Sequence, residues 1–195
     1  TTLDVLSGGR AWLGIGAGYN RDEADAMGLF LPATPERFDR LTEVLQLAHR
    51  LWSGDQAPFH GRYYQLERPI CSPPPLSTPR IPVLIGGTGE RRTLRLVAEY
   101  GDAANFFDVP DGGATLRRKL KVLAEHCATV GRRYDDIQCT VTTALAPGEH
   151  ADQLADRCRA LQALGADHVV LIASEPWHDV NLATVVETAT LLKAA

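Results

Sequence analysis

The stretch Ile81-Pro82-Val83-Leu84-Ile85-Gly86-Gly87-Thr88-Gly89 joins a short apolar run to a segment rich in glycine. An apolar run that ends in glycines predicts a buried strand. Residues 90–100 follow at once, with Leu94, Val97 and Ala98 at helical spacing. The stretch therefore predicts a strand, a glycine loop and a helix in direct succession, which is the repeating unit of a parallel α/β sheet.

The same order of elements recurs along the chain. Strand patterns occupy residues 10–18, 81–85, 102–107, 137–143 and 168–173, and helical patterns occupy residues 35–52, 90–100, 113–130, 150–164 and 179–193. Strict alternation predicts a parallel sheet with helices outside it, so the fold class is α/β. An open doubly wound sheet and a (β/α) barrel both fit this pattern. A barrel needs eight such units and about 250 residues, so either the sheet is open or part of a barrel is absent.

Composition narrows the choice of partners. The chain has 195 residues, of which 45% are apolar and 23% charged, and its formal net charge is −4. This is the composition of a globular protein with a sizeable core, and it offers no basic stripe for nucleic acid. No apolar run approaches the roughly 18–20 residues that span a bilayer, and the first residues form no secretory leader. We expect a cytoplasmic protein that binds neither nucleic acid nor a membrane.

The sequence has no pattern typical of a metal site or of a catalytic serine or cysteine nucleophile. Cys71, Cys127, Cys139 and Cys158 are scattered without a C-x-x-C pair, and no two histidines have the H-x-x-x-H spacing. We expect reduced, buried thiols and no metal site. No serine or cysteine stands in an elbow sequence with a supporting histidine, which argues against hydrolysis through a nucleophile.

The loop Gly86-Gly87-Thr88-Gly89 is a candidate phosphate site. It runs into a predicted helix N-terminus, where backbone N–H groups and the positive end of the helix dipole attract anions. Thr88 could add a hydroxyl donor, and Arg91 or Arg92 a positive charge. The alternative is a tight turn between strand and helix beside solvated arginines.

A second glycine run, Gly14-x-Gly16-x-Gly18, ends the first predicted strand. It lacks the dinucleotide-binding spacing G-x-G-x-x-G, because Tyr19 and Arg21 stand where a third glycine would fall. We interpret these glycines as positions of close strand packing and turning. Tyr19 could stack on a ring and Asn20 could hydrogen-bond to its edge; alternatively, Asn20 caps a helix that starts at Arg21.

Several motifs in the same order resemble the bacterial luciferase-like monooxygenase family, in particular its branch dependent on the deazaflavin coenzyme F420. They are residues 3–10 (LDVLSGGR), 14–20 (GIGAGYN), 36–41 (ERFDRL), 61–64 (GRYY), 81–89 (IPVLIGGTG) and 94–102 (LRLVAEYGD). The resemblance covers nearly the whole chain, and the number of motifs makes it specific.

The resemblance implies a (β/α)8 TIM barrel of the luciferase-like type that is incomplete here. The five strands would be the fourth to the eighth, with the first three βα units absent before Thr1. Residues 1–195 would form a single partial barrel domain with an insertion-like excursion at about residues 55–80. In that excursion Pro73-Pro74-Pro75 rules out a helix interior.

The resemblance also implies a cofactor, with coenzyme F420 expected and FMN as the alternative. The residues matched to cofactor binding are Ala17, Gly18, Tyr19 and Asn20 near the tricyclic ring, and Gly86, Gly87, Thr88 and Gly89 at the phosphate. The catalytic residue stays unknown, because in this family much of the face that meets the ring comes from the absent early strands. Asn105-Phe106-Phe107 departs from the Gly-Trp-Asn of many relatives, so this strand end is left out of the predicted site.

The function that the resemblance implies is that of a flavin- or deazaflavin-dependent oxidoreductase. The first hypothesis is F420-dependent hydride transfer to or from a small organic substrate, and the second is a monooxygenase that uses reduced FMN. A third, from another class, is a non-catalytic remnant or an assembly module whose open sheet edge pairs with another chain. The expected assembly is a homodimer.

Overall fold

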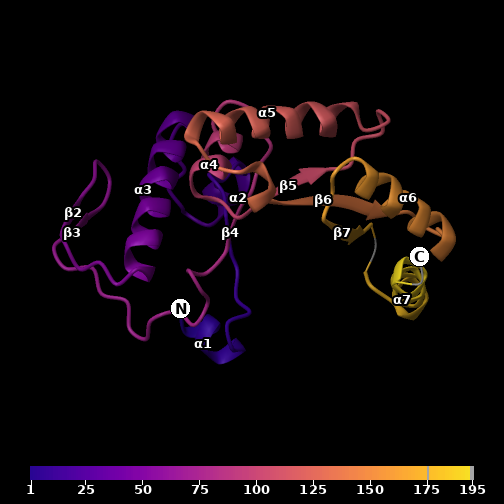
Figure 1. Cartoon of the computed structure of the whole chain (residues 1–195), viewed down its shortest axis with the longest axis horizontal. Coiled ribbons are helices and arrows are strands. Elements are labelled where there is room, and N and C mark those ends of the chain that lie inside the picture. The colour runs from indigo at the N-terminus through magenta and orange to yellow at the C-terminus, as the bar shows by residue number, and fades with distance from the viewer. Residues whose placement is uncertain (175, 194–195) are drawn as a thin grey trace.

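The computed structural model describes residues 1–174 and 176–193, and in that part five strands form one parallel sheet in the order β1-β4-β5-β6-β7. The strands are β1 (Leu13–Ile15), β4 (Val83–Ile85), β5 (Ala103–Phe107), β6 (Gln138–Leu145) and β7 (His168–Ala173). The helices are α1 (Thr2–Ser7), α2 (Arg21–Ala26), α3 (Thr34–Trp52), α4 (Thr93–Tyr100), α5 (Ala114–Val130), α6 (Ala151–Ala163) and α7 (Asp179–Lys193). The predicted α/β class and the alternation of strands and helices are confirmed (Figure 1).

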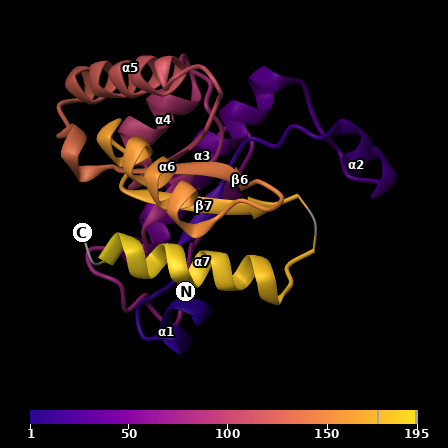
Figure 2. The ribbon, with the colours of Figure 1, turned by 90° about the vertical axis from the view of Figure 1, so that its right-hand side faces the viewer.

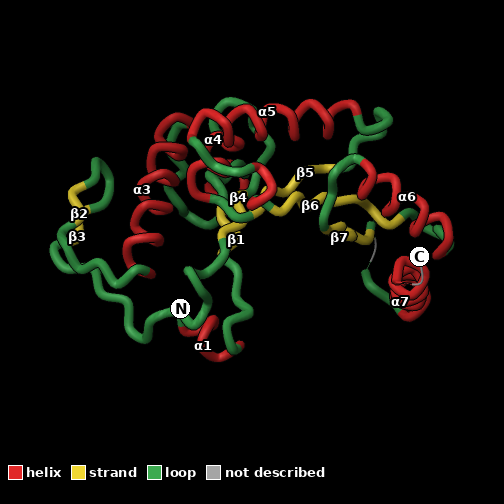
Figure 3. The backbone as a smooth tube through the Cα atoms, viewed as in Figure 1, coloured by secondary structure: helices red, strands yellow, loops and turns green. Residues whose placement is uncertain are grey.

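One face of the sheet carries the hydrophobic core. Side chains alternate between the two faces of a strand, and alternate residues of β4, β5 and β6 join the core formed with helices α3, α4 and α5, which Figure 3 shows outside the strands. Leu145 of β6 and Leu171 of β7 pack in a smaller cluster with α6 and α7. Burial of each such side chain contributes about 1.5–3 kcal/mol. The fully buried members are Val83, Ile85, Phe106 and Val141 of the strands, Leu45 of α3, Leu94 and Val97 of α4, and Leu123 of α5.

The opposite face of the sheet is far more open. Phe107 of β5 is 57% exposed and Ile172 of β7 is 52% exposed. The strand predicted at residues 10–18 is also less enclosed than expected, because β1 covers only Leu13–Ile15 and pairs on one side alone, with β4. Its prediction as a buried strand is therefore wrong, since a sheet edge leaves Gly14 exposed.

Residues 59–66 form a small hairpin, β2 (Phe59–His60) with β3 (Gln65–Leu66), apart from the main sheet. Figure 1 shows it beyond α3, away from the other strands. The Glu43 carboxylate of α3 accepts the N–H groups of Arg62, Tyr63 and Tyr64 at 2.7–3.1 Å. A Cβ at Gly61 would lie 2.4 Å from Glu43 Oε2, so this clamp requires glycine at the hairpin turn.

The N-terminal helix α1 is tied to the segment before β4, and the sequence did not predict it. Asp4 is fully buried, and its carboxylate accepts the N–H groups of Leu76 and Ser77 and the Ser77 hydroxyl at 2.6–2.9 Å. Hydrogen bonds from Ser77 hold the pKa of Asp4 below its ordinary value. Of the helices described, none has the length and apolar character needed to cross a membrane.

Candidate functional site

The two predicted site segments meet where β1 and β4 end. The Gly86 N–H donates to the Ile15 carbonyl at 2.7 Å, which continues the pairing of the strands by one residue. A Cβ at Gly16 would lie 3.2 Å from the Gly86 oxygen, so glycine at this position permits the close approach. The interpretation of Gly16 as a packing glycine is confirmed. Both segments lie at the carboxyl end of the strands, where parallel α/β folds gather their ligands.

The loop after β4 presents unpaired backbone donors. The N–H groups of Gly87, Thr88 and Gly89 donate no hydrogen bond within the described part of the chain. Gly87 has φ +109°, a conformation that L side chains rarely adopt, and a Cβ there would lie 3.4 Å from Thr93 Cγ2. Consecutive free N–H groups in such a turn form a concave anion-binding surface.

Helix α4 starts later than the sequence predicts. The pattern placed its start at residue 90, whereas residues 90–92 form a turn and the helix begins at Thr93. Thr93 is 3% exposed and fills the space under the loop, with its hydroxyl near Gly87 and Gly89. The loop therefore reaches the helix through an extra turn, and its free N–H groups, more than the helix dipole, are what an anion would meet.

Two cations lie beside this loop, one on α5 and one in the turn before α4. Lys119 Nζ of α5 donates to the Thr88 carbonyl at 2.6 Å and lies 3.9 Å from the Glu90 carboxylate. Arg92 lies 5.6 Å from the centre of the Phe38 ring and donates to the Pro35 carbonyl of α3. The pocket at this place measures about 550 Å³ and is lined by Phe38, Thr88, Gly89, Glu90, Arg91, Arg92 and Lys119.

The segment after β1 is arranged differently. Asn20 Oδ1 accepts the Glu23 N–H at 3.1 Å and so caps α2, as one of the two interpretations predicted. Tyr19 is 90% exposed. Helix α2 projects from the body of the molecule (Figure 2). Gly16 and Ala17 line a pocket of about 200 Å³ between β1 and α3, whereas the lining given for this pocket in the described part of the chain does not include Gly18, Tyr19 or Asn20.

The end of β5 uses its polar side chain internally. Asn105 Oδ1 accepts the hydroxyls of Thr140 at 2.7 Å and Thr142 at 3.1 Å, both on β6. These three side chains lie on the open face of the sheet, on the opposite side from Phe106 and Val141. Asn105 thus ties two strands together.

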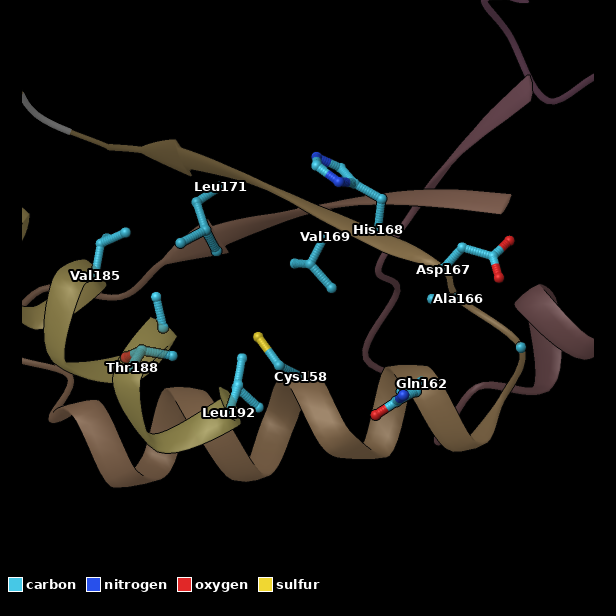
Figure 4. A pocket seen from close by; sticks show the side chains of 12 residues that line it. Cys158, Gln162, Ala166, Asp167, His168, Val169, Leu171, Val185, Thr188 and Leu192 are labelled. Atoms are coloured by element: carbon cyan, nitrogen blue, oxygen red, sulfur yellow. The ribbon is translucent and has the colours of Figure 1, made fainter. Parts of the chain in front are cut away.

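Another cavity lies between α6, β7 and α7. It measures about 590 Å³, and Figure 4 shows Cys158, Leu171 and Leu192 in its wall while His168 points away from them. Burial raises the pKa of the Cys158 thiol, which keeps it in the unreactive protonated form. None of the residues predicted for cofactor binding lines this cavity.

The cysteines that the structure describes are all free thiols, and Cys127, Cys139 and Cys158 are buried as predicted. The prediction is wrong for Cys71, which is only half-buried. Burial raises the pKa of Cys139 to about 12. Among residues 1–174 and 176–193, no cluster of three or more histidine, cysteine or acidic side chains could hold a metal ion.

Comparison with known proteins decides the family. Residues 1–187 match the profile of luciferase-like monooxygenases. The chain belongs to this family. A solved structure of an F420-dependent secondary alcohol dehydrogenase superposes with a TM-score of 0.79 at 18% identity, over 96% of this chain and 71% of that one. The predicted fold, an incomplete luciferase-like TIM barrel, is confirmed by this match and by the five parallel strands.

Two relatives are named for different reactions, one as a dehydrogenase and one as a monooxygenase. The F420-dependent glucose-6-phosphate dehydrogenase of Kineococcus radiotolerans is 34% identical over 162 residues, which are 81% of this chain and 46% of the relative. The pyrimidine monooxygenase of Allorhizobium ampelinum is 33% identical over 133 residues, 64% of this chain and 35% of the relative. The chain thus spans less than half the length of these curated relatives.

Proposed function

We propose that this chain carries the phosphate-binding part of a deazaflavin-dependent oxidoreductase that transfers a hydride to or from a small organic molecule with coenzyme F420. The observation that carries the proposal is the loop after β4, where three consecutive N–H groups are free beside Lys119 and Arg92. Relatives named as F420-dependent dehydrogenases support the choice of coenzyme.

The residues present fit the phosphate end of such a coenzyme. The N–H groups of Gly87, Thr88 and Gly89 would hold the phosphate oxygens, and the Thr88 hydroxyl would add a donor. Lys119 of α5 holds the loop by donating a hydrogen bond to the Thr88 carbonyl, and it adds a positive charge. The coenzyme itself would supply the hydride chemistry, while the protein binds and orients it.

At the ring end the proposal assigns Ala17, Gly18, Tyr19 and Asn20. Ala17 lines the pocket beside β1, and Gly18, with φ +73°, turns the chain away from the strand. The Asn20 side-chain oxygen is used by the cap of α2, so its amide nitrogen is the group left for a ring edge. Tyr19 would offer an exposed aromatic face for stacking.

A titration followed by cofactor fluorescence tests this function. We expect the 195-residue chain to bind the deazaflavin coenzyme saturably, more tightly than FMN, and to bind riboflavin, which has no phosphate, at least tenfold more weakly than FMN. Equal affinities for FMN and riboflavin, or no saturable binding of any of the three, would contradict the proposal. FMN binding above that of the deazaflavin would instead favour the second hypothesis, a monooxygenase using reduced FMN, which the pyrimidine monooxygenase relative supports.

The open sheet supports the alternative of an assembly module. Strands β1 and β7 end the described sheet, and Phe107 and Ile172 expose more than half of their surface on its open face. Such edges and apolar surface favour pairing with another chain. We propose a homodimer on this ground, and size-exclusion chromatography with light scattering would show a monomeric mass if this assembly does not form.

We further propose a cytoplasmic location and a single partial barrel domain over residues 1–195 with its excursion at about 55–80. Free thiols at Cys127, Cys139 and Cys158 fit a reducing compartment. The separate β2–β3 hairpin fits an excursion from the barrel. Limited proteolysis that cuts first within residues 55–80 and leaves the remainder intact would agree with this division.

A further inference from the structure

A second pocket lies where β1 ends, and it reaches from Ala17 of the candidate site to the first half of α3. Its volume is about 200 Å³, and it is lined by Ile15, Gly16, Ala17, Leu31, Pro32, Arg37, Arg40, Leu41, Val44 and Tyr64. Phe38 lines the pocket at the phosphate loop, and its neighbour Arg37 on α3 lines this one. The walls are apolar except for two guanidinium groups and one phenol.

Arg37 stands in this wall without a matching anion. In the described part of the chain its guanidinium donates one hydrogen bond, from Nη2 to the Thr34 hydroxyl at 2.8 Å. The Nε atom is buried and has no hydrogen-bond partner. None of the ion pairs in the described part of the chain includes Arg37. A buried N–H donor without an acceptor costs free energy unless a ligand accepts its hydrogen bond.

The other two polar residues of the wall, Arg40 and Tyr64, each have a glutamate partner, Glu36 and Glu43, and neither glutamate pairs with Arg37. Arg40 is neutralised by Glu36 at 2.7 Å, and this carboxylate, together with Tyr64, raises the pKa of Arg40. Tyr64 is positioned by the Glu43 clamp on its backbone N–H. The wall therefore carries one net positive charge, and that charge belongs to Arg37.

We propose that this pocket binds the anionic head of an organic molecule, a carboxylate or phosphate group. Arg37 would pair with the anion, while Ile15, Leu41 and Val44 contact the attached carbon atoms. A planar guanidinium with free N–H groups matches either oxyanion. The anion could belong to the substrate or to a second acidic group of the cofactor. The site rests on the pocket and on Arg37, and it stands whether or not the proposed coenzyme binds.

Nuclear magnetic resonance of the ¹⁵N-labelled chain tests the site directly. Inorganic phosphate and acetate are titrated while the Arg37 Nε–H signal and the amides of Ala17 and Tyr64 are followed, with sodium chloride of equal ionic strength as the reference. We expect saturable shifts at these groups and an affinity at least tenfold lower, read from the two amides, in Arg37→Gln. Arg68→Gln is the matched control, because Arg68 is exposed and lies outside both pockets.

Stability separates binding from a structural role. Because Arg37 makes one hydrogen bond and carries an unpaired charge, we expect Arg37→Gln to melt at or above the temperature of the unaltered chain in anion-free buffer. A lower Tm for Arg37→Gln, or shifts reproduced by sodium chloride alone, would overturn the proposal. Phosphate bound at the loop is distinguished by the amides of Gly87 and Gly89, which Arg37→Gln should leave responsive.

The deazaflavin coenzyme then identifies the source of the anion. A loss of coenzyme affinity of tenfold or more in Arg37→Gln assigns the anion to the cofactor, whereas an unchanged affinity assigns it to the substrate. If the coenzyme binds neither the unaltered chain nor Arg37→Gln, while phosphate still binds the unaltered chain saturably at Ala17 and Tyr64, the proposed function is wrong and the anion site is supported.

Discussion

Two glycine-rich strand ends lie side by side in this protein and do different work. After β1, Gly16 permits close packing on Gly86, and Asn20 caps α2 four residues later. After β4, Gly87 turns with a positive φ and the chain makes an extra turn before α4, which leaves three N–H groups free. Glycine content alone therefore does not make an anion site. The backbone N–H groups of the segment must also remain free of hydrogen bonds to the helix that follows.

The largest effect is expected at Gly87. Gly87→Ala forces a Cβ into a backbone region with φ +109° and against Thr93, so we expect a loss of stability of about 1–3 kcal/mol. Affinity for the deazaflavin coenzyme should fall about a hundredfold, since displaced N–H groups forfeit charge-assisted bonds worth about 1.5–3 kcal/mol each. Denaturant unfolding and fluorescence titration measure the two quantities. Unchanged affinity would remove the loop from the site.

The next effect is expected at Lys119, which holds the loop after β4 from outside. Lys119→Met removes the bond to the Thr88 carbonyl and one positive charge, so coenzyme affinity should fall about tenfold. Lys121→Met is the matched control, because Lys121 is exposed on the same helix. Equal affinities for the two variants would show that the loop needs no support from α5.

A smaller effect is expected at Asn20, whose side chain caps α2 in the segment after β1. Asn20→Ala removes the cap of α2, which is worth about 1 kcal/mol. Hydrogen exchange at the Glu23 amide should accelerate about fivefold, because that N–H loses its acceptor. Asn20→Asp keeps an acceptor and should restore protection; exchange that stays fast in Asn20→Asp would argue against the cap.

The smallest effect is expected at Gly14. A Cβ at this position meets nothing within 4 Å, and its φ is not in the left-handed region. Gly14→Ala should therefore change the free energy of unfolding by less than about 0.5 kcal/mol and leave coenzyme affinity unaltered. A large change in either quantity would mean that the two glycine segments are more alike than their packing indicates.

Much of the fold is visible in the sequence because periodicity reports burial locally. Leu94, Val97 and Ala98 repeat at helical spacing and are all fully buried, as the pattern predicts. Helix α1 escaped prediction because its stability depends on Asp4, which is bonded to Leu76 and Ser77 more than seventy residues away. The late start of α4 likewise depends on Thr93 packing under a loop, which no local pattern records.

The candidate site is predictable only in part for the same reason. The glycines of Gly86–Gly89 predict a turn, and Asn20 predicts a helix cap, because these residue types favour those conformations. Lys119 and Phe38 reach the same pocket from α5 and α3, and nothing in their local sequence marks them. Arg37 could not be singled out from the sequence either, because only the folded chain shows that its buried Nε–H has no hydrogen-bond acceptor.

Phosphate binding at the loop after β4 is tested most directly by an amide titration of the ¹⁵N-labelled chain with FMN and, in parallel, with riboflavin. We expect FMN to shift the amides of Gly87, Thr88 and Gly89 saturably and riboflavin, which has no phosphate, to leave them unshifted. Equal shifts with both ligands, or no shift at these three amides with FMN, would contradict the claim that the loop after β4 binds phosphate.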